Sequence, residues 1–131
     1  MQVTKTEIPG VLIISPPRFG DARGFFSETF RADGYAAAGM PHPFVQDNWS
    51  HSRHGVLRGL HLQNPKAQSK LVSVIRGHVL DVAVDVRVGS PSFGKHVAVE
   101  LSEENGRQFF LPRGCAHGFV VLSEIADFRD F

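Results

Sequence analysis

Short apolar or alternating segments, separated by turn-forming residues, recur along almost the whole chain. Each is strand-length, and glycine and proline are common between them. This spacing predicts an all-β fold, an antiparallel β-sandwich or barrel, over residues 11–14, 25–30, 44–50, 56–63, 70–75, 78–86, 96–101, 107–111 and 116–122. One short helix is expected at Ala32–Ala38, where an alanine-rich stretch precedes Gly39.

Size and charge narrow the class of protein further. The 131 residues suit one domain spanning residues 1–131, and a net charge of +1 without a basic block argues against nucleic acid as a partner. Cys115 is the single cysteine and therefore forms no intrachain disulfide. The N-terminus lacks a secretion signal, and no apolar stretch approaches the roughly 20 residues that cross a bilayer. We expect a soluble, cytoplasmic protein that does not bind membranes.

The clearest strand, residues 78–86, has two chemically different faces. Asp81 and Asp85 share one face of the strand. The other face carries four apolar residues, Leu80, Val82, Val84 and Val86. One face is therefore predicted to be dry and the other at least partly polar. Lys70 likewise shares a face with Val72 and Val74, at the end of an apolar row.

Polar side chains in apolar strands suggest that the sandwich holds a ligand. Gln46, Asn48 and Ser50 share a face, which is an unusual concentration of polar groups for a strand. A sandwich with one polar interior face can enclose a polar ligand.

His61 is the histidine whose position most suggests a catalytic role. It lies in a strand between leucines, and this pattern alone favours a histidine satisfied in the core. Neutral imidazole is nevertheless a suitable general base near pH 7, and Arg58 and Lys70 are nearby cations that could stabilise an oxyanion. Simple alternation puts Arg58 and His61 on opposite faces, so a bulge at Gly59 is required to bring them together. The other turn-proximal histidines are expected at the surface: His42, His51, His54 and His96.

Metal binding is the alternative use of these histidines. His61 is followed by Gln63 and Gln68, and the segment 112–117 adds only His117. Glutamine is a poor ligand for transition metals, and two distant histidines without a carboxylate close to either in the sequence are a weak metal signal. We therefore expect no metal and no other cofactor.

A group of charged residues near the N-terminus could hold an anionic ligand. Arginine makes two-point contacts with phosphate oxygens, so Arg23 together with Arg58 could clamp a diphosphate. Glu28 could accept hydrogen bonds from a hydroxyl or another donor edge. Each arginine alone is more often a solvated surface charge.

Six ordered motifs resemble the dTDP-4-dehydrorhamnose 3,5-epimerases: FGDARGFFSE at 19–28, VQDN at 45–48, GVLRGLHLQ at 55–63, QSKLV at 68–72, DVAVDVR at 81–87 and PRGCAHGF at 112–119. The resemblance implies a cupin-type jelly roll that is a homodimer with exchanged or shared strands and works without a metal. It also implies a dTDP-linked 4-keto-6-deoxyhexose as substrate. The implied reaction epimerises C3 and C5 of dTDP-4-dehydro-6-deoxy-D-glucose and gives dTDP-4-dehydro-L-rhamnose. Protons at C3 and C5 lie next to the C4 ketone, so a base can remove each and leave an enolate.

The same resemblance assigns roles to individual residues. By motif position, His61 is the base and Lys70 is the cation beside the enolate. The remaining matched residues line the nucleotide-sugar site: Arg23, Glu28, Gln46, Asp47, Asn48, Arg58 and His117.

The sequence departs from the family near Phe131. Family members continue beyond this point and carry a tyrosine proton donor just after the segment resembling 122–128, whereas this chain reads Phe128-Arg-Asp-Phe131. The aspartate that partners the catalytic histidine also lies later in the family, and Asp81 is a conceivable local substitute. Without the tyrosine proton donor, we expect return of a proton to the sugar carbon to be impaired more than removal of its proton. The open alternatives are a sugar-nucleotide binding protein, a 3-epimerase-like relative and a metal-dependent cupin.

Overall fold

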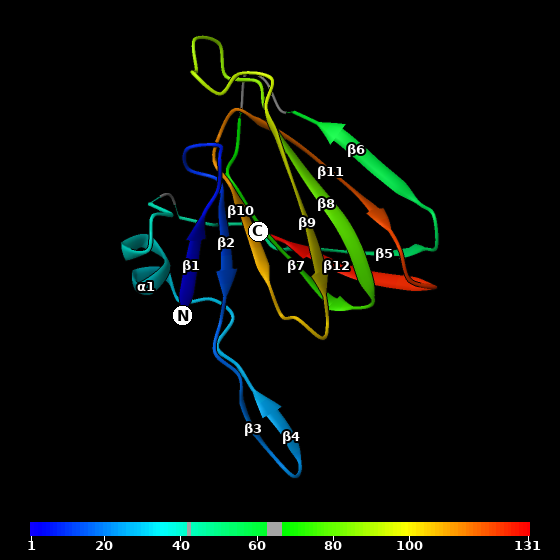
Figure 1. Cartoon of the computed structure of the whole chain (residues 1–131). Coiled ribbons are helices and arrows are strands. Elements are labelled where there is room, and N and C mark those ends of the chain that lie inside the picture. The colour runs from blue at the N-terminus through cyan, green and yellow to red at the C-terminus, as the bar shows by residue number, and fades with distance from the viewer. Residues whose placement is uncertain (42, 63–66) are drawn as a thin grey trace.

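The chain folds into two antiparallel β-sheets that pack face to face, together with one hairpin and one helix (Figure 1). This computed structural model describes residues 1–41, 43–62 and 67–131. The larger sheet has the strand order β1 (Gln2–Lys5), β2 (Leu12–Ser15), β10 (Gln108–Leu111), β7 (Lys70–Arg76), β12 (Ile125–Asp130) and β5 (Asn48–Arg53). The smaller sheet has the order β6 (Leu57–His61), β11 (Cys115–Val121), β8 (His78–Asp85) and β9 (His96–Ser102).

The connections between strands fit the predicted sandwich. Every strand pair in the described residues is antiparallel. From β5 onward the chain passes from one sheet to the other at nearly every connection, so strands distant in sequence become neighbours. The prediction of an all-β antiparallel sandwich is confirmed.

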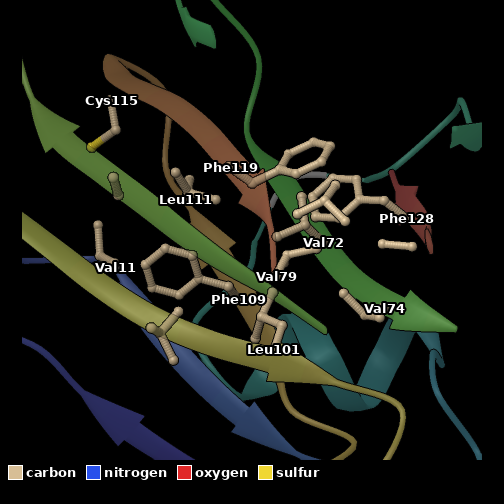
Figure 2. Close-up of a cluster of buried hydrophobic side chains, with 14 of the residues drawn as sticks. Val11, Val72, Val74, Val79, Leu101, Phe109, Leu111, Cys115, Phe119 and Phe128 are labelled. Atoms are coloured by element: carbon tan, nitrogen blue, oxygen red, sulfur yellow. The ribbon is translucent and has the colours of Figure 1, made fainter. Parts of the chain in front are cut away.

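The main core lies between the inner faces of the two sheets (Figure 2). Alternate residues of each strand point inward, as the pleat requires, and Phe109 at the centre is fully buried. Both sheets contribute to this core, the larger through Val72, Val74, Phe109, Leu111, Ala126 and Phe128 and the smaller through Val79, Ala83, Val99, Leu101, Cys115, Phe119 and Val121.

Strand β8 corrects the expected assignment of its two faces. The face bearing Asp81 and Asp85 is completely buried between the sheets, whereas Leu80, Val82 and Val84 are only half-buried. The apolar row lies on the outer surface of the smaller sheet. Buried carboxylates need polar partners, and both aspartates have them.

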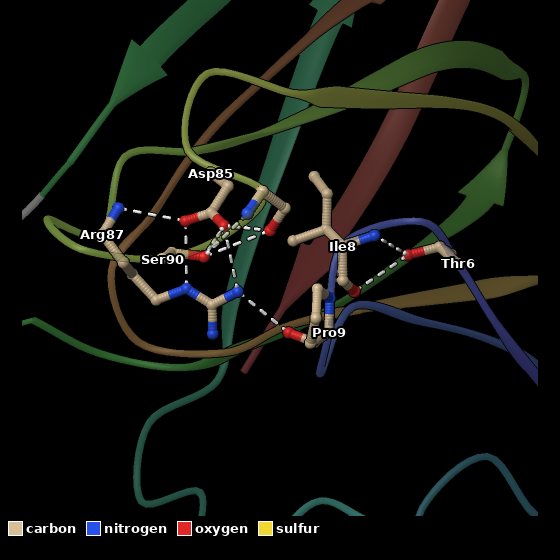
Figure 3. Close-up of polar contacts among 7 residues, drawn as sticks. Thr6, Ile8, Pro9, Asp85, Arg87 and Ser90 are labelled. Carbon is tan, nitrogen blue, oxygen red and sulfur yellow. Dashed lines mark hydrogen bonds and ion pairs between the residues drawn. The ribbon is translucent and has the colours of Figure 1, made fainter.

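Asp85 is held by a cluster that ties the β8–β9 turn to the N-terminal loop (Figure 3). Its carboxylate accepts hydrogen bonds from the backbone N–H and Nε of Arg87, each at 3.0 Å, and from the hydroxyl of Ser90 at 2.6 Å. Ser92 donates to the same carboxylate. Arg87 also donates to the carbonyl of Pro9 at 2.9 Å. The Arg87 guanidinium, followed by the two serine hydroxyls, holds the pKa of Asp85 well below its usual range.

A second apolar cluster covers part of the outer face of the larger sheet. Helix α1 (Ala32–Ala37) ends before Gly39, whose φ of +111° stops the helix, and buries Tyr35 against the sheet. The Tyr35 hydroxyl bonds the Thr29 carbonyl and Oε1 of Gln108, both at 2.8 Å, and burial raises its pKa to about 12. Other members of this cluster are Leu12, Ile14, Met40, Leu71 and Phe110. Within the described residues, no helix has the length and apolar character needed to cross a membrane.

The hairpin formed by β3 (Phe19–Asp21) and β4 (Gly24–Phe26) extends away from the sandwich (Figure 1). Arg23 at its turn pairs with Asp21 at 2.7 Å. Three phenylalanines of the hairpin are more than half exposed: Phe19, Phe25 and Phe26. The hairpin therefore presents aromatic surface with no covering layer in the described part of the chain.

Candidate active site

Arg58 and His61 lie on the same face of β6 because the strand contains an irregularity. His61 pairs with His117 on β11, and Arg58 pairs with Phe119. The step from Arg58 to His61 is three residues long, whereas the facing step on β11 is two residues long, so β6 contains one extra residue. His117 and Phe119 share the inner face of their strand. Arg58 and His61 are therefore on that inner face as well. The bulge predicted at Gly59 is confirmed.

Gly59 makes this arrangement possible through its small size. Its φ is +105°, and a Cβ at this position would lie 2.5 Å from the carbonyl oxygen of His117 and 2.7 Å from Cα of Gly118. No side chain fits this approach without a shift of backbone. The glycine thereby fixes the distance between β6 and β11 at the point where both histidines project.

Behind His61, His117 and Asp81 form a buried pair. Nε2 of His117 lies 2.9 Å from both carboxylate oxygens of Asp81, and the imidazole stacks on Phe128 with ring centroids 6.0 Å apart. The Asp81 side chain is fully buried and that of His117 is 7% exposed. The imidazole is thus fixed by a hydrogen bond at its edge and an aromatic ring at its face.

Lys70 approaches the same pair from the opposite sheet. It is half-buried at the start of β7, with the parity of Val72 and Val74, as its place in the sequence predicts. Burial raises the pKa of Asp81, and the His117 hydrogen bond and the charge of Lys70 act in the opposite direction. A cation thus lies within electrostatic reach of Asp81, at the end of the apolar row.

The interpretation of Asp81 as a partner for His61 is wrong, because the carboxylate bonds His117 instead. The His61 side chain is exposed and forms no hydrogen bond with any described residue. The strand pattern did not reveal this pairing, since the face bearing Asp81 looked like the polar one. A carboxylate and a histidine on neighbouring strands became partners only once the sheet order was known.

Three of the residues expected to bind the nucleotide sugar, Arg58, Asn48 and Gln46, form polar contacts around β5 and its neighbours. Nε of Arg58 donates to Oγ of Ser52 on β5 at 3.0 Å, which links the two sheets beside His61. Asn48 contacts Gln46 at 3.1 Å, and its amide also donates to Asp130 at 3.1 Å. Gln46 lines a hollow of about 160 Å³ with residues including Gln68 and Arg113.

Asp47, in contrast, is tied to the outer face. It accepts hydrogen bonds from Nε and Nη2 of Arg129 at 2.9 and 2.7 Å, and Arg129 has the opposite parity from the inward-facing Phe128. This ion pair holds the pKa of Asp47 below its usual range. Asp47 is therefore held toward the opposite face of the larger sheet from Asn48, whose partner Asp130 has the inward parity of Phe128.

Comparison with known proteins identifies the family. The profile of dTDP-4-dehydrorhamnose 3,5-epimerase matches residues 5–129. The epimerase of Shigella flexneri is 58% identical over 98% of this chain and 72% of its own length. This chain belongs to the dTDP-4-dehydrorhamnose 3,5-epimerase family. Its sandwich is accordingly of the cupin-like type.

Solved structures support the membership of the epimerase family. The dTDP-6-deoxy-D-glucose-3,5-epimerase of Legionella pneumophila, solved with dTDP-4-keto-L-rhamnose, has a TM-score of 0.95 and 53% identity, over 98% of this chain and 69% of that one. A 3'-monoepimerase from Streptomyces bikiniensis, solved with dTDP-quinovose, has a TM-score of 0.88 and 34% identity, over 96% of this chain and 65% of that one.

Two residues that the epimerase motifs assign to the site lie elsewhere in the single chain. Arg23 is at the tip of the projecting hairpin, and Figure 1 shows this hairpin well separated from β6. Glu28 pairs with Arg31 at 3.2 Å, next to the start of α1. The structure of one chain does not bring either residue to His61, and the two-arginine clamp of Arg23 with Arg58 is not formed within it.

Metal ligands do not gather in the described part of this epimerase-family chain. No three His, Cys, Asp or Glu side chains among residues 1–41, 43–62 and 67–131 are arranged to hold an ion. Gln63, which the metal interpretation considered, lies outside the described residues. The groups that do converge are an exposed imidazole, a buried imidazole–carboxylate pair, an ammonium and a guanidinium. Such a set can remove a proton next to a carbonyl and stabilise the resulting negative charge.

Proposed function

We propose that this chain epimerises C3 and C5 of dTDP-4-dehydro-6-deoxy-D-glucose to give dTDP-4-dehydro-L-rhamnose, a step in the synthesis of dTDP-rhamnose. The observation that carries the proposal is the bulge at Gly59, which puts His61 and Arg58 on the inner face beside His117. Family membership supplies the substrate class, and the Legionella pneumophila relative was solved with the corresponding product.

The chemistry requires a base and a cation around a 4-keto sugar. His61 removes the proton at C3 or C5, and the electron pair of the C–H bond moves into the C4 carbonyl to form an enolate. Lys70 stabilises the enolate oxygen, and a proton returned to the opposite face of the carbon completes the inversion. Arg58, Gln46 and Asn48 hold the polar nucleotide-sugar portion.

Arg23, Glu28 and Asp47 enter this proposal through a homodimer. The hairpin presents Phe19, Phe25 and Phe26 to solvent, and an exposed aromatic patch of this kind favours association. In the proposed dimer the hairpin of each subunit reaches its partner, where Arg23 and Glu28 contribute to sugar-nucleotide binding. Asp47 binds the sugar nucleotide once its ion pair with Arg129 has opened. We place the enzyme in the cytoplasm and assign it no nucleic-acid or membrane partner and no metal.

The dimer is tested by light scattering on the purified chain. The double variant Phe25→Ser with Phe26→Ser should become monomeric, whereas Val88→Ser, which changes a 97% exposed residue elsewhere, should not. A monomeric parent protein would contradict the shared-site arrangement.

The activity is tested by incubating dTDP-4-keto-6-deoxyglucose with the protein in deuterium oxide and following C3 and C5 by NMR. Deuterium at both carbons together with the L-rhamno product supports the proposal. His61→Ala should slow exchange by about 10²- to 10⁴-fold. His96→Ala, an exposed histidine on β9, is the matched control and should exchange normally.

Three other results of this experiment, and one result of a metal assay on the purified protein, would replace the proposal. Exchange at C3 alone would indicate a 3-epimerase, as in the Streptomyces bikiniensis relative. Exchange at both carbons with little product would show that the deuteron returns to the original face, so that delivery to the opposite face is the impaired step. Binding without any exchange would indicate a sugar-nucleotide binding protein, and stoichiometric iron, zinc or manganese would favour a metal-dependent cupin.

A further inference from the structure

Asp81 is a completely buried carboxylate to which the proposed chemistry gives no role. It points from β8 into the space between the sheets, and its Oδ1 is the one fully buried side-chain polar atom without a hydrogen-bond partner in the described residues. Placing a carboxylate there is unfavourable unless it interacts with a cation or a donor. Its contact is Nε2 of His117, and its nearby charge is that of Lys70.

The geometry of this contact indicates which nitrogen of His117 carries the proton. Nε2 lies 2.9 Å from both oxygens of Asp81 and is hydrogen-bonded to Oδ2, and an ionised carboxylate can only accept a hydrogen bond, so the proton of this contact belongs to Nε2. A hydrogen bond to a carboxylate at one ring nitrogen fixes the tautomer and the orientation of an imidazole. His117 then has its proton on Nε2, and its Nδ1 carries a lone pair.

The other nitrogen of His117 is the one open to a ligand. Nδ1 makes no hydrogen bond with any described residue, and it is not among the fully buried polar atoms that lack a partner. It therefore has access to open space, on the wall that His61 shares through the pairing of β6 with β11. A ligand near His61 is within reach of a hydrogen-bond acceptor at His117.

We infer that Asp81 is a positioning residue that holds His117 as the Nε2–H tautomer, so that Nδ1 accepts a hydrogen bond from a ring hydroxyl of the bound 4-keto sugar. The inference rests on the proposed function and deepens it. This hydrogen bond holds the hydroxyl nearest an acidic carbon beside His61. The sugar is thereby oriented so that His61 can remove the proton from that carbon. Selectivity for a hydroxylated sugar follows, because the bound ligand covers Nδ1, and a deoxy analogue that leaves this covered acceptor unpaired loses binding or rate.

The direct test is the tautomer of His117 in the wild-type protein, read from the ¹⁵N chemical shifts and proton couplings of its imidazole. The expected result is a protonated Nε2 and an unprotonated Nδ1 near neutral pH. A proton on Nδ1 in the neutral ring would overturn the inference, whether or not the protein proves to be an epimerase.

The variant Asp81→Asn provides the functional test. The amide can donate to Nε2 and so favour the Nδ1–H tautomer, which turns the acceptor into a donor. C5 exchange should fall by about ten- to a hundredfold at saturating substrate. Asp85→Asn is the matched control, since Asp85 is equally buried on the same face of β8 but bonds Arg87; it should alter stability without changing the His117 tautomer.

Substrate analogues separate positioning from a merely structural role. Two substrate analogues are compared, one lacking the C2 hydroxyl and one lacking the C3 hydroxyl. With the wild type, C5 exchange should fall for one of these analogues relative to the full substrate. In Asp81→Asn the same analogue should show little further loss. Equal losses in both proteins, or equal exchange in Asp81→Asn and the wild type, would refute the inference. If the wild type exchanges no proton, the proposed function fails, whereas the tautomer measurement still decides the role of Asp81.

Discussion

Replacing Gly59 by alanine should disrupt the contact between β6 and β11 more than any other glycine substitution near the site. A non-glycine residue at positive φ costs roughly 1–2 kcal/mol. The new Cβ would also lie 2.5 Å from the carbonyl oxygen of His117, and overpacking of this kind costs about 1–3 kcal/mol. We expect Gly59→Ala to lower the free energy of unfolding by about 2–5 kcal/mol.

Gly55 provides a control that separates these two contributions. Its φ is +78°, but no atom lies within 4 Å of the position that a Cβ would occupy. Gly55→Ala should therefore cost only the backbone contribution of roughly 1–2 kcal/mol. Urea unfolding followed by far-ultraviolet circular dichroism measures both variants. Equal losses of stability in the two would refute the argument that the close approach at Gly59 positions the site.

Three further outcomes follow from buried groups. Phe109→Ala should lower the free energy of unfolding by about 3–5 kcal/mol in the same urea assay, because it removes the fully buried centre of the core. Since the pKa of Asp85 is lower in the folded chain than its ordinary value near 3.8, its stabilisation is present above that pH and is lost as the pH falls further; Asp85→Asn should reduce this acid dependence in unfolding measured from pH 5 to pH 2. Tyr35, the single tyrosine, should ionise near pH 12 rather than pH 10 in an ultraviolet absorbance titration, provided that the chain stays folded; a midpoint near 10 would contradict its burial.

Strand identity was predictable where one pattern dominated. The segments 70–75, 78–86 and 96–101 correspond closely to β7, β8 and β9 because their residues alternate in the pleat. The segment 44–50 was placed too early, since Phe44 packs in the cluster beneath α1 and the strand begins at Asn48. Strand β12 was missed because three of its six residues are charged and its inward apolar pair, Ala126 and Phe128, is short.

The site was predictable in part for related reasons. The sequence indicates that Arg58 and His61 need a bulge to share a face, and the glycine between them identifies where it lies. The burial of Asp81 was not predictable, because an aspartate in an alternating strand usually marks the solvent side. Its partner His117 comes from a neighbouring strand, so the pair depends on sheet order rather than on local sequence.

The position of β12 between β7 and the edge strand β5 has a consequence for how the large sheet assembles. Within the described residues, β5 joins that sheet only through β12, which is synthesised long after it. Until β12 emerges from the ribosome, the edge of β7 and the whole of β5 lack their native partner. Such non-local pairing slows folding and leaves strand edges open to other chains. Expression at lower temperature or with chaperones should therefore increase the yield of soluble protein.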